Sequence, residues 1–497
     1  MEALDWLVIG VFFLALIGII VWVVRQKQND SADYFLGGRD ATWLAIGASI
    51  FASNIGSEHL IGLAGAGASS GMAMAHWEIQ GWMILILGWV FVPFYTRSMV
   101  YTMPEFLERR YNPQSRTILS VISLVSYVLT KVAVTVYAGG LVFQQVFGIK
   151  ELWGIDFFWI AAIGLVVLTA LYTIFGGMKS VLYTSVLQTP ILLLGSLIIL
   201  VLGFKELGGW DEMMRVCGAV TVNDYGDTMT NLIRSNDDAN FPWLGALIGS
   251  AIIGFWYWCT DQFIVQRVLS GKNEMEARRG TIFGAYLKLL PVFLFLIPGM
   301  IAFALHQKYI GAGGEGFLPM LENGTANADA AFPTLVAKLL PAGVKGLVVC
   351  GILAALMSSL ASLFNSSAML FTIDFYKRFR PQTSEKKLVG IGQVATVVIV
   401  ILGILWIPIM RSVGDVLYTY LQDVQSVLAP GIAAAFLLGI CWKRTSAQGG
   451  MWGLISGMVI GLTRLGAKVY YSNAGEVADS TFKYLFYDMN WLFFCGW

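Results

Sequence analysis

The sequence predicts an all-α protein that crosses a lipid bilayer many times. Hydrophobic residues make up 57% of the 497 residues and charged residues only 13%, and the mean hydropathy is +0.70. Apolar runs of about 20 residues, the length that crosses a bilayer as a helix, recur along the whole chain. Two of these runs are interrupted by glycine and polar residues, which is typical of a binding site inside a membrane.

The apolar runs predict about 13 membrane spans, of which the last is incomplete. Their approximate bounds are 4–25, 42–69, 73–97, 117–147, 155–175, 181–203, 242–266, 281–305, 343–374, 388–410, 415–440 and 447–466, with a further run that opens near 482. The N-terminus, MEALD, is acidic and lacks the basic region of a signal peptide, so we expect the first run to be a retained helix.

Basic residues gather in alternate connections between the predicted spans. They follow the first and third spans and recur in 267–279, in 377–387 and at Lys443 and Arg444. Cytoplasmic connections carry an excess of Lys and Arg, so this pattern places the N-terminus outside. The long connections 204–240 and 306–342 then face outward. We expect an integral protein of the cell membrane, plasma or inner.

Setting aside the first span, the next ten form two sets of five. Each set begins with an interrupted span, 42–69 broken at Asn-Ile-Gly-Ser and 242–266 broken near WYWCTDQ. Interrupted helices in corresponding positions predict inverted repeats around a site near the bilayer midplane. The predicted organisation is an extra N-terminal helix (1–35), a first five-helix repeat (36–203), an extracellular connection (204–240), a second repeat (241–441, with the loop 306–342) and extra C-terminal helices (442–497).

Several classes of function are not supported by the sequence. The formal net charge is +1, which argues against nucleic acid as a partner. The five cysteines show no CxxC spacing, the three histidines form no HExxH motif, and there is no P-loop. We therefore expect neither a metalloenzyme nor a nucleotide-driven pump, and we expect that the protein is not an enzyme.

Polar side chains inside the apolar spans are the candidates for a ligand site, because a polar group without a partner is costly in hydrocarbon. Buried Lys288 and Glu78 would lower each other's cost, although Lys288 could instead reach an interface and Glu78 could lie at the rim. A neutral polyol needs hydrogen-bond donors and acceptors and an aromatic surface. Candidates are Asn54, His59, Glu78, Lys288 and Gln422, with Trp256, Tyr257 and Trp258 as aromatic residues that could equally be packing.

A second set of residues has the chemistry of a sodium site. Sodium prefers oxygen ligands, which the hydroxyls of Ser358 and Ser359 can supply. Unwound backbone near Ala52 and Ile55 would free carbonyl groups for the same ion. A pair of serines alone is weak evidence, because small hydroxyl residues also pack membrane helices together.

Several longer runs resemble the sodium/solute symporter family, and specifically its sodium/glucose cotransporter branch. They are FASNIGSEHLIGLAG, MPEFLERRY, TALYTIFGG, WYWCTDQFIVQR, YLKLLPVFLFLIPGM, SSLASLFNSSAMLFTIDFY and AAFLLGICWKR, within about 34 to 465. The resemblance implies the LeuT fold, with two inverted five-helix repeats after one extra helix. It also implies sodium-coupled import of a hexose, of glucose or galactose type, by alternating access.

The resemblance further implies roles for individual residues. It assigns sodium to the carbonyls of Ala52, Ile55 and Ala355 and the hydroxyls of Ser358 and Ser359. It assigns the sugar to Asn54, His59, Glu78, Lys288 and Gln422, with Tyr257 stacking on the sugar ring as an inner gate and Trp258 beside it. Glu58 receives no role.

The sequence also departs from the family pattern. Ser185 and Ala361 stand where many relatives have an aspartate and a hydroxyl residue linked to a second sodium, so we favour one sodium per sugar. Gly254 and Gly56 replace polar residues of some relatives, which leaves the preferred hexose open. Other readings are a symporter of this family for myo-inositol, sialic acid or another small solute, a solute sensor without transport and, more remotely, a membrane enzyme. The sequence does not predict the oligomeric state.

Overall fold

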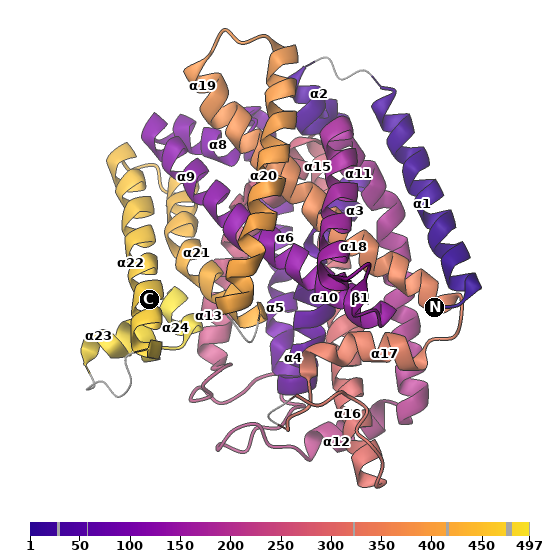
Figure 1. Ribbon diagram of the computed structural model, residues 1–497. Coiled ribbons are helices and arrows are strands. Elements are labelled where there is room, and N and C mark those ends of the chain that lie inside the picture. The colour runs from indigo at the N-terminus through magenta and orange to yellow at the C-terminus, as the bar shows by residue number, and fades with distance from the viewer. Residues whose placement is uncertain (27–29, 57, 322–323, 414–416, 474–479, 497) are drawn as a thin grey trace.

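Long helices running between two ends of the molecule dominate the computed structural model (Figure 1). It describes residues 1–497 except 27–29, 57, 322–323, 414–416, 474–479 and 497, and for some residues inside helices, 409–413 and 417–424 among them, only the backbone. The one sheet in this described part is a hairpin of β1 (Glu151–Leu152) and β2 (Ile155–Asp156). The prediction of an all-α protein is confirmed.

Seven helical segments in the described part are long and apolar enough to cross a membrane. They are Ala3–Val24, Glu58–Ser98, Phe157–Leu207, Trp243–Thr260, Glu274–Gly311, Val344–Phe379 and Glu385–Pro408. Shorter apolar helices, Trp43–Asn54, Ala133–Gln144 and Gln425–Cys441, fall in further predicted spans. Some predicted spans are joined in one segment, because a bend or a π-helical turn connects them without a loop.

The helices not treated individually below have the following bounds. They are α1 (Ala3–Val24), η1 (Gly37–Arg39), η3 (Gly71–Ala75), α5 (His76–Ile79), η4 (Gln80–Trp82), α6 (Met83–Ile86), η5 (Leu87–Phe91), α7 (Val92–Ser98), α8 (Met103–Arg110), α9 (Pro113–Ser126), η6 (Tyr127–Val132), α10 (Ala133–Phe147), α12 (Trp210–Gly218), η8 (Val292–Leu296), α16 (Ile297–Gly311), η9 (Ala328–Ala330), α17 (Ala331–Leu339), η10 (Leu370–Tyr376), α19 (Lys377–Phe379), α20 (Glu385–Val413), α21 (Leu417–Cys441) and α22 (Ala447–Asn473).

The first interrupted span is broken as predicted. Helix α3 (Trp43–Asn54) ends at Asn54, and Ile55 is extended, with φ −77° and ψ 101°. The chain resumes as the π-helix η2 (Glu58–Leu63) and continues as α4 (Ala64–Ser70). The break therefore lies inside a segment that is otherwise buried and apolar.

The second interrupted span breaks at Asp261, within the WYWCTDQ run. Helix α13 (Trp243–Gly254) passes into the π-helix η7 (Phe255–Thr260), and Asp261 is extended, with φ −74° and ψ 127°. The Asp261 side chain accepts a hydrogen bond from the Phe263 amide and so caps α14 (Gln262–Leu269). Two broken helices thus occur at corresponding places in the two predicted repeats.

Helices α15 (Glu274–Leu287) and α18 (Val344–Met369) enclose the first break. Gly47 of α3 faces α15 so closely that a Cβ at this position would lie 2.8 Å from the Gly280 carbonyl oxygen. Small residues allow this approach of helix backbones in a membrane. Helix α18 is buried along nearly its whole length and also contacts α3 and α14. The two broken helices therefore share α18 as a common support.

The predicted run near residue 482 does not form one continuous helix. It consists of α23 (Thr481–Lys483), the π-helix η11 (Tyr484–Asp488) and α24 (Trp491–Gly496), interrupted where Met489 is extended. Helix α24 packs against α13 and α21. This contact is close, because a Cβ on Gly249 would lie 2.3 Å from the Leu492 carbonyl oxygen.

Helix α11 (Phe157–Leu207) contains the predicted spans 155–175 and 181–203, joined at a bend. Gly177 has φ 53° and ψ −151°, a conformation that residues with a side chain rarely adopt. A Cβ here would also lie 2.4 Å from the carbonyl oxygen of Tyr34 in α2 (Ser31–Leu36). Glycine is therefore required both by the backbone and by the packing of α2.

We expect Gly177→Ala to destabilise the protein by about 1–3 kcal/mol, because the bend is strained for any other residue. The measurement is the thermal unfolding temperature of the purified protein in detergent. Gly164→Ala in the same helix is the matched control, since a Cβ there meets nothing within 4 Å. Equal unfolding temperatures for the two variants would contradict the requirement for glycine at the bend.

Candidate functional site

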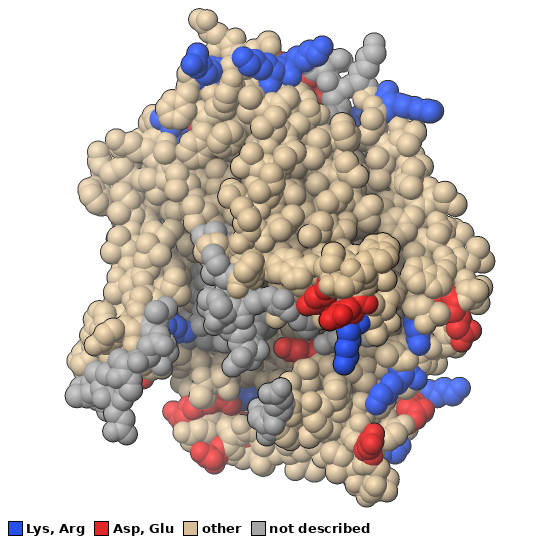
Figure 2. Space-filling model, viewed as in Figure 1, with Lys and Arg blue, Asp and Glu red and all other residues tan. Residues whose placement is uncertain are grey.

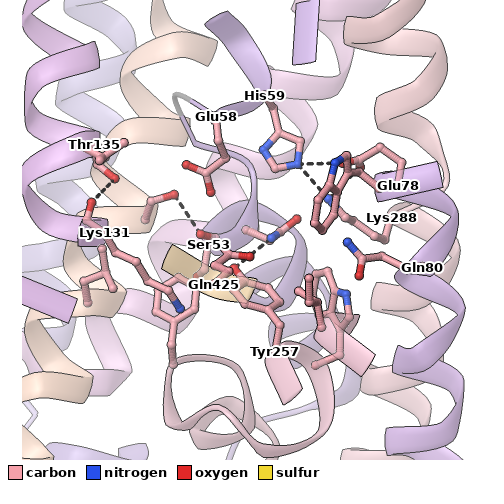
Figure 3. A pocket seen from close by; sticks show the side chains of 18 residues that line it. Ser53, Glu58, His59, Glu78, Gln80, Lys131, Thr135, Tyr257, Lys288 and Gln425 are labelled. Carbon is pink, nitrogen blue, oxygen red and sulfur yellow. Dashed lines mark hydrogen bonds and ion pairs between the residues drawn. The ribbon is translucent and has the colours of Figure 1, made fainter. Parts of the chain in front are cut away.

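A cavity lies between the two broken helices, and polar side chains from both point into it (Figure 3). The empty space among its lining atoms, including the part open to solvent, amounts to about 780 Å³. Its lining is Ser53, Asn54, Glu58, His59, Trp77, Glu78, Gln80, Lys131, Val134, Thr135, Ile253, Tyr257, Trp258, Phe263, Lys288, Ser359, Leu363 and Gln425.

Three of the predicted substrate residues form one buried cluster at a wall of the cavity. Lys288 Nζ lies 2.7 Å from Glu78 Oε2 and 2.8 Å from His59 Nε2, and His59 Nε2 lies 3.2 Å from Glu78 Oε1. The three residues are 3%, 3% and 5% exposed for Lys288, Glu78 and His59. The alternatives of an interfacial lysine and a rim carboxylate are therefore wrong, because the two groups are buried as an ion pair.

The cluster leaves polar atoms that face the cavity without a protein partner. His59 Nε2 lies between the Lys288 ammonium, which donates, and the Glu78 carboxylate, which accepts, while His59 Nδ1 is left for an occupant. Buried atoms with no hydrogen-bond partner in the described part include His59 Nδ1, Asn54 Oδ1 and Gln80 Oε1. Such atoms are rare in protein interiors unless a ligand or water satisfies them. The cavity thus presents both donors and acceptors to an occupant.

Tyr257 and Trp258 form the aromatic side of the cavity. The Asn54 side-chain amide donates to the Tyr257 hydroxyl at 3.0 Å, which links the first break to the second. The Tyr257 and Trp258 rings are perpendicular, with centroids 4.9 Å apart. Lys288 Nζ lies 5.6 Å from the Trp258 ring centroid. The predicted gate residue is therefore held by contacts on both repeats.

A second buried ion pair lies beneath this aromatic side. Lys131 Nζ is 2.6 Å from Asp261 Oδ2 and 4.6 Å from the Tyr257 ring centroid. Tyr127 donates its hydroxyl hydrogen to the same carboxylate. The pair fixes the residue at which the second helix breaks. The position of the aromatic residues therefore depends on a charge pair outside the predicted set.

Two glycines make room for the polar side chains of Lys288 and Gln80. A Cβ on Gly81 would lie 2.7 Å from Lys288 Cγ, so a larger residue would obstruct the lysine side chain. A Cβ on Gly254 would lie 2.7 Å from Gln80 Oε1. Gln80 therefore occupies the space beside Gly254.

The predicted sodium ligands gather at the first break, although not all of them touch. Ser359 Oγ donates to the Ser53 carbonyl oxygen at 2.8 Å and lies 3.4 Å from that of Ile55. Ser358 Oγ instead lies 3.2 Å from Ser185 Oγ. Ala52 and Ala355 are buried. The assignment of sodium to these residues remains a prediction.

A buried arginine adjoins this group of hydroxyls. Arg267 is 1% exposed, and its guanidinium donates to Ser53 Oγ at 2.8 Å and to Ser49 Oγ at 3.1 Å. It forms no ion pair with any carboxylate in the described part of the chain, and its Nη1 has no hydrogen-bond partner there. A positive charge that forms no ion pair within the described residues therefore lies beside the predicted sodium ligands.

The sequence prediction missed several residues of the cavity. Gln80, Lys131, Gln425 and Glu58 line it, and Asp261 holds Lys131. Lys131 could have been found, because a lysine inside a predicted span is itself a signal of function. Gln422 lies in α21, but its side chain is outside the described residues, so its role stays a prediction.

Fold and site together define a polytopic helical membrane protein with a buried polar cavity at the junction of two broken helices. Residues 34–457 match the sodium:solute symporter family, and the chain belongs to that family. It is therefore a sodium-coupled solute symporter, as the resemblance of its motifs implied.

Proteins similar to this chain include sodium cotransporters. The sodium/myo-inositol cotransporter 2 of Homo sapiens is 38% identical over 94% of this chain and 70% of that protein. The sodium/glucose cotransporter 2 of Rattus norvegicus is 38% identical over 99% of this chain and 75% of that protein. Among solved structures, a sodium-coupled sialic acid symporter in a substrate-bound outward-open state matches with a TM-score of 0.78 and 22% identity, over 99% of this chain and 94% of that one. This similarity confirms the LeuT fold.

We expect Glu78→Gln to cost about 3 kcal/mol of stability, because it leaves the buried Lys288 ammonium without its counter-charge. The double variant Glu78→Gln with Lys288→Met removes both charges and should recover most of that loss. Thermal unfolding in detergent measures this difference, and solute uptake should be impaired in both variants. A single variant as stable as the wild type would contradict a buried ion pair.

Proposed function

We propose that the chain imports a neutral hexose of glucose or galactose type together with one sodium ion. The observation that carries this proposal is the cavity itself, where His59 Nδ1, Asn54 Oδ1 and Gln80 Oε1 have no hydrogen-bond partner among the described residues and lie near the Tyr257 and Trp258 rings. A sugar ring presents hydroxyls that both donate and accept and a C–H face that packs on an aromatic ring. Lys288, Glu78, Tyr257, Trp258 and Gln422 complete the proposed site.

The charge pattern favours a neutral solute over an anion such as sialic acid. Both lysines that line the cavity are ion-paired, Lys288 with Glu78 and Lys131 with Asp261. An anionic solute would have to compete with these carboxylates for the ammonium groups, and it would meet the unpaired Glu58. A neutral polyol can hydrogen-bond to the paired groups without separating them.

The second candidate solute is myo-inositol. It is favoured by relatives named sodium/myo-inositol cotransporter 2, which are as similar to this chain as those named sodium/glucose cotransporter. Inositol is also a neutral ring with a hydroxyl on each carbon, so it suits the same donors and acceptors. Which ring is preferred depends on how its hydroxyls meet the unpartnered atoms of the cavity.

Coupling is proposed to occur at the first break. Sodium bound by the carbonyls of Ala52, Ile55 and Ala355 and the hydroxyls of Ser358 and Ser359 would fix the backbone that carries Asn54 and His59. Sodium binding then tightens solute binding, and by reciprocity the solute tightens sodium binding by the same factor. One sodium ion, driven by 100 mV and a tenfold gradient, could support roughly 500-fold accumulation of solute.

A stoichiometry of one sodium is supported by the surroundings of Ser185. Its hydroxyl contacts those of Ser49 and Ser358 at 3.4 and 3.2 Å. The Arg267 guanidinium also contacts Ser49. A second cation here would meet this positive charge without the aspartate that many relatives provide.

The proposed orientation has the N-terminus outside, in a plasma or inner membrane. Figure 2 shows Lys and Arg gathered at the end of the molecule that carries α19 and the start of α20, with most Asp and Glu of this face toward the opposite end. An excess of basic residues marks the cytoplasmic end. The start of α1 lies toward the opposite end in Figure 1.

Uptake by the protein in proteoliposomes tests the function directly. With labelled glucose, galactose, myo-inositol, sialic acid and proline, we expect accumulation of a neutral ring solute under a sodium gradient and none under a potassium gradient. Accumulation of sialic acid or proline alone would overturn the proposed solute class. Specific binding without accumulation would instead indicate a sensor.

We expect Ser359→Ala to raise the sodium concentration for half-maximal uptake about tenfold, because it removes a neutral oxygen ligand. Ser69→Ala is the control, since Ser69 is an exposed serine at the end of α4. Unchanged sodium activation in Ser359→Ala would argue against the proposed ion site. Loss of folding is excluded by comparing the unfolding temperatures of the two variants.

A further inference from the structure

Glu58 is a charged residue of the cavity to which the proposed function assigns no ligand. Its carboxylate points into the cavity from the start of η2 (Figure 3). It makes no hydrogen bond through its side chain and no ion pair with any residue in the described ranges, whereas Lys288 pairs with Glu78 and Lys131 with Asp261. It is only partly buried. An unpaired carboxylate therefore lies in a cavity whose other charges are balanced.

The carboxylate lies on the same side of the break as the proposed sodium ligands. A Cβ built on Gly56 would be 3.0 Å from Glu58 Oε2 and 3.1 Å from Ser359 Oγ. Both oxygens thus lie within 3.1 Å of one point beside Gly56. A side chain at position 56 would fill the space between them, so glycine keeps this approach open.

The local charges require a negative group near a bound sodium ion. All five proposed sodium ligands are neutral carbonyl or hydroxyl oxygens. Arg267, which contacts Ser53 at 2.8 Å, adds a second positive charge with no carboxylate within ion-pair distance in the described part. Two positive charges in a low-dielectric interior are costly unless a negative charge lies close by.

We propose that the carboxylate of Glu58 is the counter-charge of the transported sodium ion. It supplies the negative charge that the neutral ligand set lacks and so raises the sodium affinity of the break. Glu58 is followed directly by His59, so attraction of its carboxylate toward the ion also fixes the residue that contacts the solute. The inference rests on the proposed sodium site and names a residue outside the predicted ligands.

The test is sodium binding by the variant Glu58→Gln, which keeps the size of the side chain and removes its charge. Sodium binding to the full-length protein in detergent is followed by tryptophan fluorescence without solute, because Trp77 and Trp258 line the cavity. We expect the sodium dissociation constant to rise about tenfold or more. Glu58→Asp should give a smaller rise, since it retains the charge.

Glu151→Gln is the matched control, because Glu151 is an exposed carboxylate in the hairpin. Its sodium affinity should equal that of the wild type. Unchanged sodium affinity in Glu58→Gln would overturn the inference. A variant with normal sodium affinity but weaker solute binding at saturating sodium would also overturn it, by making Glu58 a solute contact. Failure of the proposed function can be told apart from failure of this inference. In the first case the wild-type protein itself would bind no sodium or show no sodium-driven uptake.

Discussion

The constraint on which the structure depends is the satisfaction of backbone groups where a helix stops inside a membrane. At Ile55 helix α3 has ended, and the Ile55 amide donates the last helical hydrogen bond, to the Phe51 carbonyl. Ser359 of α18 meets this need, since its hydroxyl donates to the Ser53 carbonyl at 2.8 Å and lies 3.4 Å from that of Ile55. Ser359 Oγ and the Ile55 carbonyl oxygen are also among the oxygens proposed for sodium, so the support of the break and the binding of the ion share these two groups.

The second break is stabilised differently, and the difference clarifies the role of the first. At Asp261 the carboxylate accepts from the Phe263 amide and pairs with Lys131 at 2.6 Å. This break thus pairs its carboxylate with a lysine, whereas at the first break the Arg267 guanidinium donates to serine hydroxyls. The hydrogen bond from Asn54 to Tyr257 joins the two. A change at the first break can therefore reach the aromatic side of the cavity through one side chain.

The sequence predicted the helical class, the positions of both breaks and the polar residues His59, Glu78 and Lys288, because glycine and polar groups stand out in apolar spans. The pairing of Lys288 with Glu78 could be predicted, because burying either charge without the other costs free energy. It did not predict the partners of Lys131 or the place of Gln80. Those contacts join residues far apart in the chain, and no local pattern specifies which faces of two helices meet. The sequence also did not predict the bend at Gly177, because glycine is common in membrane helices.

The polar atoms of the cavity bear on how a solute is selected. Among the described residues, His59 Nδ1, Asn54 Oδ1 and Gln80 Oε1 have no hydrogen-bond partner. A ring whose hydroxyl groups pair with these atoms is therefore favoured over one that leaves them unpaired. Each of these atoms that stays unpaired costs about 1–3 kcal/mol. Two rings of equal size that differ in one hydroxyl can thus differ in affinity by tenfold or more, so selection depends on hydrogen-bond matching and not on volume.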